Sequence, residues 1–265
     1  MKTIDTNELK TIQLKILDKV DDFCQGNGIN YFLIYGTLIG AVRHKGYIPW
    51  DDDIDIGMLR EDYDKFVATF NGFHEDYTLH SSEREKWYPL PFAKVGFNKS
   101  VLQEENEMLK QNIGVNIDVF PFDRLPSNKL RAKIVRLKAK LLRNMITLKG
   151  MVPNKDRTLT KRILLRVLKF VLLPFSGSAL VGMQIRNATA CKEKSNSVAP
   201  LVWEWWQTND IETEKLEPCK MVFEGKEYLA PVGYDQWLRG KYGDYMQLPP
   251  EEKRVSHHRF TAYYK

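Results

Sequence analysis

The sequence predicts an α/β or α+β domain with a basic helical insertion, and three observations lead to this expectation. Short segments with the apolar alternation of strands are interspersed with segments that have the three-to-four-residue apolar spacing of amphipathic helices. The 265 residues suffice for one large domain, or for one domain with a sizeable appendage. The composition, 43% hydrophobic and 28% charged, is that of a folded globular protein and excludes disorder as the main state.

The first elements are expected between the N-terminus and residue 58. A helix is predicted over residues 8–24, where apolar residues recur every three or four positions. Residues 29–35 are apolar and aromatic, which is typical of a buried strand, and they run into a short helix that reaches Lys45. Residues 51–58 alternate acidic and apolar side chains, and this alternation predicts a strand.

A helix over residues 61–70 and strands over 92–97 and 114–120 complete the expected core. We assign residues 1–126 to this core and residues 127–215 to a basic helical insertion. Residues 216–265 are expected to pack back on the core.

The basic insertion concentrates the positive charge of the chain. The net charge of the whole chain is +6, but residues 128–169 contain 14 Lys or Arg and one acid, against 26 basic and 33 acidic residues elsewhere. Two helical apolar stripes run through the segment: Leu130, Ile134, Leu137, Leu141, Met145 and Leu148, then Leu159, Ile163, Val167 and Val171. A charge distribution of this kind favours an anionic partner.

Three partners are compatible with the charge of the basic insertion. Nucleic acid is disfavoured because no recognised nucleic-acid module accompanies the patch. An anionic membrane surface fits helices that have one apolar and one basic face. A helical hairpin packed on the core is the alternative, because amphipathic stripes usually face a core.

Neither a membrane-spanning segment nor a secretion signal is expected. The most apolar run, residues 163–175, is short and is interrupted by Arg166, Lys169 and Pro174. The polar N-terminus lacks the apolar part of a signal peptide, so we expect a cytoplasmic location. The three cysteines are widely spaced and odd in number, which fits neither a disulfide framework nor a zinc site.

A run of aspartates on the strand expected over residues 51–58 is the first candidate for chemistry. Strand geometry puts Asp51, Asp53 and Asp55 on one face, with Asp52 on the other. Like charges so close repel each other unless a cation neutralises them, and hard oxygen ligands suit Mg²⁺ or Mn²⁺. A solvated acidic turn after Trp50 is the alternative.

Asp118 is a second candidate, because it interrupts an apolar strand pattern 63 positions after Asp55. Taken alone it could be a partly buried capping acid. On a strand adjacent to the aspartate run, it would complete a divalent-metal site and take the proton from an attacking hydroxyl.

Gly36 and Thr37 lie at the expected strand-to-helix junction. Glycine there lets backbone N–H groups approach a phosphate, although many such turns carry glycine for conformational reasons alone. A phosphate-binding turn followed by a carboxylate strand is the layout expected of enzymes that transfer phosphate groups from nucleotides.

These motifs together resemble the nucleotidyltransferase fold. More narrowly, residues 35–57 are similar to the signature of the LicD family, which includes bacterial phosphocholine transferases and is related to fukutin-type ribitol-phosphate transferases. The end of the chain, with residues 242–246, Pro249-Pro250 and His257-His258, resembles the closing motif of that family. The resemblance covers residues 29–122 and 223–264.

The resemblance implies a mixed sheet flanked by helices and a magnesium-dependent phosphotransferase. The donor would be a CDP-alcohol, CDP-choline first, and the acceptor a hydroxyl of a cell-surface glycan precursor, either lipid-linked or free; CMP would leave. A protein peripherally associated with the inner face of the membrane would meet such an acceptor.

Site roles follow from these expectations. Asp53, Asp55 and Asp118 are the catalytic candidates, and with Asp51 they form the expected metal site. Gly36 and Thr37 would bind a donor phosphate, and its charge would be compensated by Arg43, Lys94 and His258. Two alternatives stay open: a nucleotidyltransferase that releases pyrophosphate, and a non-catalytic glycan- or lipid-binding protein.

Overall fold

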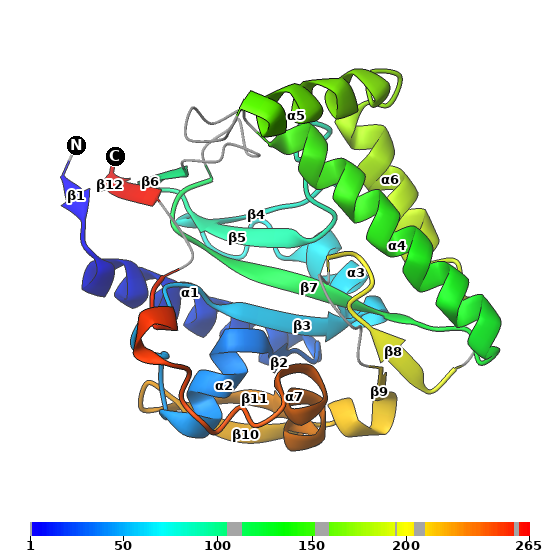
Figure 1. Ribbon diagram of the computed structural model, residues 1–265. Coiled ribbons are helices and arrows are strands. Elements are labelled where there is room, and N and C mark those ends of the chain that lie inside the picture. Colours follow the sequence, from blue (N-terminus) through cyan, green and yellow to red (C-terminus); the bar gives the residue numbers. More distant parts are fainter. Residues whose placement is uncertain (1, 105–112, 152–158, 194, 204–209, 257–259) are drawn as a thin grey trace.

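The computed structural model describes residues 2–104, 113–151, 159–193, 195–203, 210–256 and 260–265 (Figure 1). The central sheet has the strand order β2-β3-β7-β5-β4, with β8 paired to β7 and β9 paired to β8. Strands β3 and β7 are parallel, whereas the other pairs of this sheet are antiparallel. The predicted mixed α/β fold is therefore confirmed.

The elements of the first half are β1 (Thr3–Ile4), α1 (Thr6–Asn27), β2 (Phe32–Leu33), α2 (Tyr35–Arg43), β3 (Asp55–Leu59), α3 (Arg60–Thr69), β4 (Tyr77–His80), β5 (Ala93–Phe97), β6 (Ser100–Glu104) and β7 (Asn116–Arg124). Those of the second half are α4 (Lys129–Gly150), α5 (Leu159–Val171), α6 (Gly177–Ala188), β8 (Ser197–Ala199), β9 (Ile211–Glu212), a 3₁₀ turn (Thr213–Leu216), β10 (Pro218–Phe223), β11 (Lys226–Pro231), α7 (Tyr234–Tyr242), a second 3₁₀ turn (Glu251–Lys253) and β12 (Phe260–Tyr264).

Helix α1 begins and ends at strong local signals and buries its whole apolar stripe. The Asp5 side chain accepts a hydrogen bond from the Glu8 N–H, and the Glu8 carboxylate accepts one from the Asp5 N–H. Gly28 ends the helix in the left-handed conformation at φ 61°. The stripe residues are all buried: Leu9, Ile12, Ile16, Val20 and Phe23. Helix α1 thus packs as the apolar spacing predicts.

Helices cover both faces of the sheet. On one face, Phe23 of α1 packs edge-on against Phe66 of α3. On the other face, Tyr35 at the start of α2 contacts both Phe120 of β7 and Trp237 of α7. Asp118 and Phe120, two positions apart on β7, share this second face, which is therefore the face that carries the site.

Strands β2 and β3 both differ from their predictions: β2 covers only Phe32–Leu33 of the predicted 29–35, and β3 starts later than predicted. Strand β3 begins at Asp55 rather than at residue 51, because Asp51 closes a turn by donating its N–H to the Ile48 carbonyl, 2.9 Å away. Strand β2 pairs with β3 only at Ile56 and Gly57, so residues 51–54 have no strand partner on that side. The expected alternation of Asp51, Asp52 and Asp53 is therefore wrong.

The segment expected to be a helical insertion contains helices and strands. Helices α4 and α6 pack against each other, and α5 lies across one end of this pair (Figure 1). The segment then returns to the sheet, because Ala199 of β8 pairs with Asp123 of β7.

The C-terminal segment lies against the core at several places, among them strand β12 and the turn between β10 and β11. Strand β12 pairs with β6 and β1 at one edge of the molecule. The turn between β10 and β11 docks on the loop after α2, where the Glu224 carboxylate accepts a hydrogen bond from the Tyr47 N–H at 2.9 Å.

Candidate active site

Three charged side chains form a row across the start of the parallel strand pair. The register aligns Asp55 of β3 with Asp118 of β7, and Asp118 with Lys94 of β5. Aligned residues on neighbouring strands point to the same face of a sheet, so Asp118 stands between Asp55 and Lys94. Two carboxylates that are 63 positions apart in the sequence are thus brought side by side.

Lys94 forms an ion pair with Asp118 and also donates to the Asn116 side-chain oxygen at 3.1 Å. Lys94 was expected to compensate the charge of a phosphate. In the structure its ammonium group lies on the Asp118 carboxylate and holds that side chain in one orientation. Lys94 is only 9% exposed, so its contacts with Asp118 and Asn116 are inside the protein.

The three aspartates before β3 form a cluster beside this row. The carboxylate oxygens of Asp51, Asp52 and Asp53 lie within 4.8 Å of one another. Asp52 therefore lies with its neighbours and not on an opposite face. Its carboxylate also accepts a hydrogen bond from the Ser256 hydroxyl at 2.6 Å, which joins the C-terminal segment to the cluster.

The electrostatics of the site centre on Asp55. Burial raises the pKa of this carboxyl well above its usual range, and the charges of Asp53, Asp118 and Asp51 raise it further. Lys94 acts in the opposite direction but does not reverse the shift. A cluster of this kind favours a cation that keeps all the carboxylates ionised.

Gly36 and Thr37 contact two of the aspartates directly. The Thr37 hydroxyl accepts a hydrogen bond from the Asp55 N–H at 2.8 Å and is 3% exposed, so it fixes the start of β3. A side chain at position 36 would collide with the Asp51 carboxylate, which lies against this glycine. The two residues expected to cradle a phosphate are thus contact partners of the metal-site candidates.

Arg43 and His258 complete the predicted residues. Arg43 donates to the Tyr245 carbonyl at 2.6 Å and to the Gln247 carbonyl at 3.3 Å. It therefore holds the C-terminal motif against α2, and burial lowers its pKa. His258 lies outside the described residues.

Gln13 is a site residue that the sequence analysis missed. It is buried on the apolar face of α1 and donates to the Asp52 carbonyl at 2.9 Å and to the Asn116 carbonyl at 3.3 Å. The Tyr47 hydroxyl donates to its side-chain oxygen at 3.1 Å. A polar residue between Ile12 and Ile16 was the available signal, because a buried amide needs partners.

Tyr35 was also missed as a structural feature of the site. It adopts a positive φ of 49°, which is uncommon for a bulky residue and marks a constrained position. Its ring lies between Phe120 and Trp237, and the Lys241 ammonium lies 4.8 Å from the ring centroid. This conformation sets where the chain turns into Gly36.

The carboxylates fit a divalent cation by their chemistry. Asp51, Asp53, Asp55 and Asp118 supply the hard oxygen donors that Mg²⁺ and Mn²⁺ take. The geometry supports this, because the Asp51, Asp52 and Asp53 oxygens lie within 4.8 Å of one another. Asp55 and Asp118 are aligned on neighbouring strands. These four residues would hold the ion.

Comparisons with known proteins identify relatives of this chain. A sequence model of the LicD/FKTN/FKRP nucleotidyltransferase domain matches residues 28–141. The chain is 31% identical to the lipopolysaccharide cholinephosphotransferase LicD of Haemophilus influenzae, over 99% of each chain. A shorter stretch is 51% identical to the human ribitol 5-phosphate transferase FKRP, over 13% of this chain and 7% of that protein. The chain therefore belongs to the LicD family.

Proposed function

We propose that the protein is a Mg²⁺-dependent phosphotransferase that moves phosphocholine, or a related phospho-alcohol, from a CDP-alcohol to a hydroxyl of a cell-surface glycan precursor. The observation that carries the proposal is the juxtaposition of Asp55 and Asp118 beside the Asp51–Asp53 cluster. The printed name of the full-length relative supports a cholinephosphotransferase with a lipopolysaccharide acceptor.

The aspartates and Lys94 have different roles in the proposed reaction. The chemistry that Mg²⁺ would supply at this site, when bound, is neutralisation of charge at the donor diphosphate. Asp51, Asp53, Asp55 and Asp118 would bind the ion, and the ion pair with Lys94 would fix the orientation of Asp118. The acceptor oxygen attacks the phosphorus of the phospho-alcohol, the bond to the CMP oxygen breaks, and Asp118 takes the hydroxyl proton. CMP leaves, and a phosphodiester forms on the glycan.

Phosphorus NMR with Mg²⁺, a panel of CDP-alcohols and a glycan acceptor extract tests the proposal. We expect CMP and a new phosphodiester from one donor, and no turnover with Asp55→Asn or in EDTA. Asp64→Asn is the matched control, because Asp64 is an exposed acid next to Arg60 on α3. Pyrophosphate as the product would indicate a nucleotidyltransferase instead. Donor binding without turnover, in the presence of acceptor, would indicate a binding protein.

A further inference from the structure

Helix α4 exposes an apolar stripe in addition to the side that it buries. Leu130, Ile134, Leu137 and Leu141 are between 45% and 68% exposed. The opposite side of the helix packs on α6 through Ala139 and Ile146, which are buried. The stripe is therefore not the core-facing side of α4, and so large an apolar surface marks an interaction site.

Basic residues border this stripe on both sides. With 100° between successive helical residues, Lys133 and Lys140 flank one edge and Arg131 and Lys138 flank the other. The sequence of α4 contains no acidic residue. An apolar strip between two basic edges is the arrangement of a helix that lies in the interface of an anionic bilayer.

Helix α5 has the same character. Ile163, Val167, Phe170 and Val171 are between 52% and 73% exposed, whereas Leu165 and Leu172 are buried. No acidic residue occurs in the sequence of α5. The Lys149 ammonium donates to the Leu172 carbonyl at 3.0 Å, and this contact holds the ends of the two helices together.

We propose that α4 and α5 dock on an anionic lipid bilayer. The exposed apolar side chains enter the boundary between headgroups and acyl chains, and the flanking Lys and Arg contact the anionic headgroups. Among the described residues every helix is too short or too polar to cross a bilayer, so the contact is with the surface. This inference is independent of the reaction proposed above.

Two other occupants fit the same surface less well. A nucleic acid would neutralise the basic edges but would leave the leucines exposed, because its backbone offers phosphates and sugars. A second copy of this chain would cover the leucines but would bring two strongly basic helices face to face. A bilayer with anionic lipids satisfies both the apolar and the charged parts.

Vesicle flotation of the full chain tests the proposal. We expect binding to phosphatidylcholine vesicles containing about 30% phosphatidylglycerol, weak binding to pure phosphatidylcholine, and a decrease as salt is raised. Lys133→Ala/Lys140→Ala should lower the affinity on the order of 30-fold, which corresponds to about 1 kcal/mol for each lysine. Leu137→Ser/Leu141→Ser should lower it at least about tenfold.

Matched control variants separate this surface from general effects. Lys15→Ala/Lys86→Ala removes two exposed lysines elsewhere, and Val222→Ser/Val232→Ser removes two exposed apolar residues elsewhere. Both controls should bind vesicles like the wild type. Circular dichroism and thermal melting should show that every variant keeps the fold.

Several results would overturn the proposal. These are no flotation with anionic vesicles, equal binding to neutral vesicles, or equal losses in the control variants. Light scattering on the purified protein provides another test: a dimer that Leu137→Ser/Leu141→Ser converts to a monomer would assign the surface to a second copy. Binding of duplex DNA that the leucine variant leaves unchanged, without vesicle binding, would assign it to nucleic acid.

Discussion

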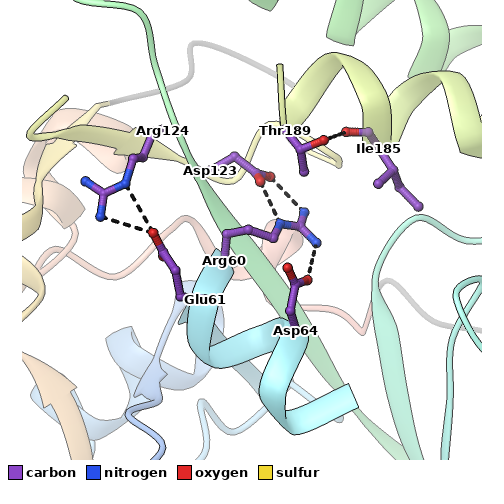
Figure 2. A network of polar contacts seen from close by, with 7 residues as sticks. All are labelled: Arg60, Glu61, Asp64, Asp123, Arg124, Ile185 and Thr189. Carbon is purple, nitrogen blue, oxygen red and sulfur yellow. Dashed lines mark hydrogen bonds and ion pairs between the residues drawn. The ribbon is translucent and has the colours of Figure 1, made fainter. Parts of the chain in front are cut away.

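At the start of the β3–β7 pair, Asp55 and Asp118 stand side by side, whereas just beyond the other end Asp123 meets the guanidinium of Arg60 (Figure 2). Arg60 donates from Nε and from a terminal nitrogen to the two Asp123 oxygens, at 2.7 and 3.0 Å. Asp123 is 1% exposed, and burial raises its pKa, but the charge and the bidentate hydrogen bonds of Arg60 act against this rise.

The pKa of Asp55 is raised by burial as well, but most of its charged neighbours are carboxylates, which raise it further, and Lys94 acts against them. The difference teaches that burial alone does not identify a functional acid. A buried carboxylate with a bidentate arginine has its partner within the fold, whereas a buried carboxylate among like charges is a candidate for binding a cation.

The largest expected effect is at the start of the β3–β7 pair, where Asp55 and Asp118 lie. Asp55→Asn should lower phosphotransfer on the order of 1,000-fold, because it removes a ligand at the charge-stabilising centre. In EDTA the same change should raise the melting temperature, since a neutral side chain relieves repulsion among the carboxylates. Differential scanning fluorimetry with and without Mg²⁺ measures this effect, and Mg²⁺ should stabilise the wild type but hardly the variant. A lower melting temperature in EDTA would contradict the assignment of Asp55.

The next effect is at the opposite end of the β3–β7 pair, where Arg60 pairs with Asp123. Arg60→Met should lower the free energy of unfolding by about 3–5 kcal/mol, because it leaves the Asp123 charge buried without its partner. Urea denaturation measures the loss, and Arg60→Met/Asp123→Asn should recover much of it. Glu61→Gln is the surface control, since its pair with Arg124 is exposed and contributes at most about 1 kcal/mol. A single variant as stable as the wild type would remove the contrast between the two ends.

A smaller effect is expected at Gln13, which donates hydrogen bonds to the backbone beside the aspartate cluster. Gln13→Leu should cost about 1–3 kcal/mol, because the buried carbonyls of Asp52 and Asn116 lose their donor. It should also weaken Mg²⁺ binding, measured by calorimetry, through movement of the aspartate cluster. Gln25→Leu, on the exposed side of α1, is the control and should change neither quantity. Unchanged Mg²⁺ affinity in Gln13→Leu would restrict Gln13 to stability.

The smallest effect in this series is at Gly36. Gly36→Ala should lower turnover roughly tenfold while the free energy of unfolding changes by less than about 1 kcal/mol, because the Asp51 carboxylate can rotate away from the added methyl group. Gly26→Ala on α1 has open space around it and should leave activity intact. Steady-state kinetics at several Mg²⁺ concentrations would show whether the defect is in metal binding. Wild-type kinetics would mean that the position of Asp51 is unimportant.

Local patterns predicted most of the core. The helix around Leu9–Phe23, the helix starting near Arg60 and the strand that carries Lys94 all occur where their periodicity places them. Asp118 could be recognised because an acid in an apolar strand is conspicuous. The conformation of Asp51–Asp53 could not be predicted, because it depends on the turn that Asp51 closes with Ile48 and on how far β2 extends along β3.

Helices α1 and α4 separate what sequence determines from what tertiary structure decides. Both have 22 residues and both carry an apolar stripe at helical spacing, so the sequence alone determined that each is an amphipathic helix. The stripe of α1 is buried, whereas Leu130, Ile134, Leu137 and Leu141 of α4 are exposed. Periodicity records which side chains share a face, but the element that meets this face depends on contacts distant in sequence. For α4 the docking of α6 on the opposite side decided that this stripe stays at the surface.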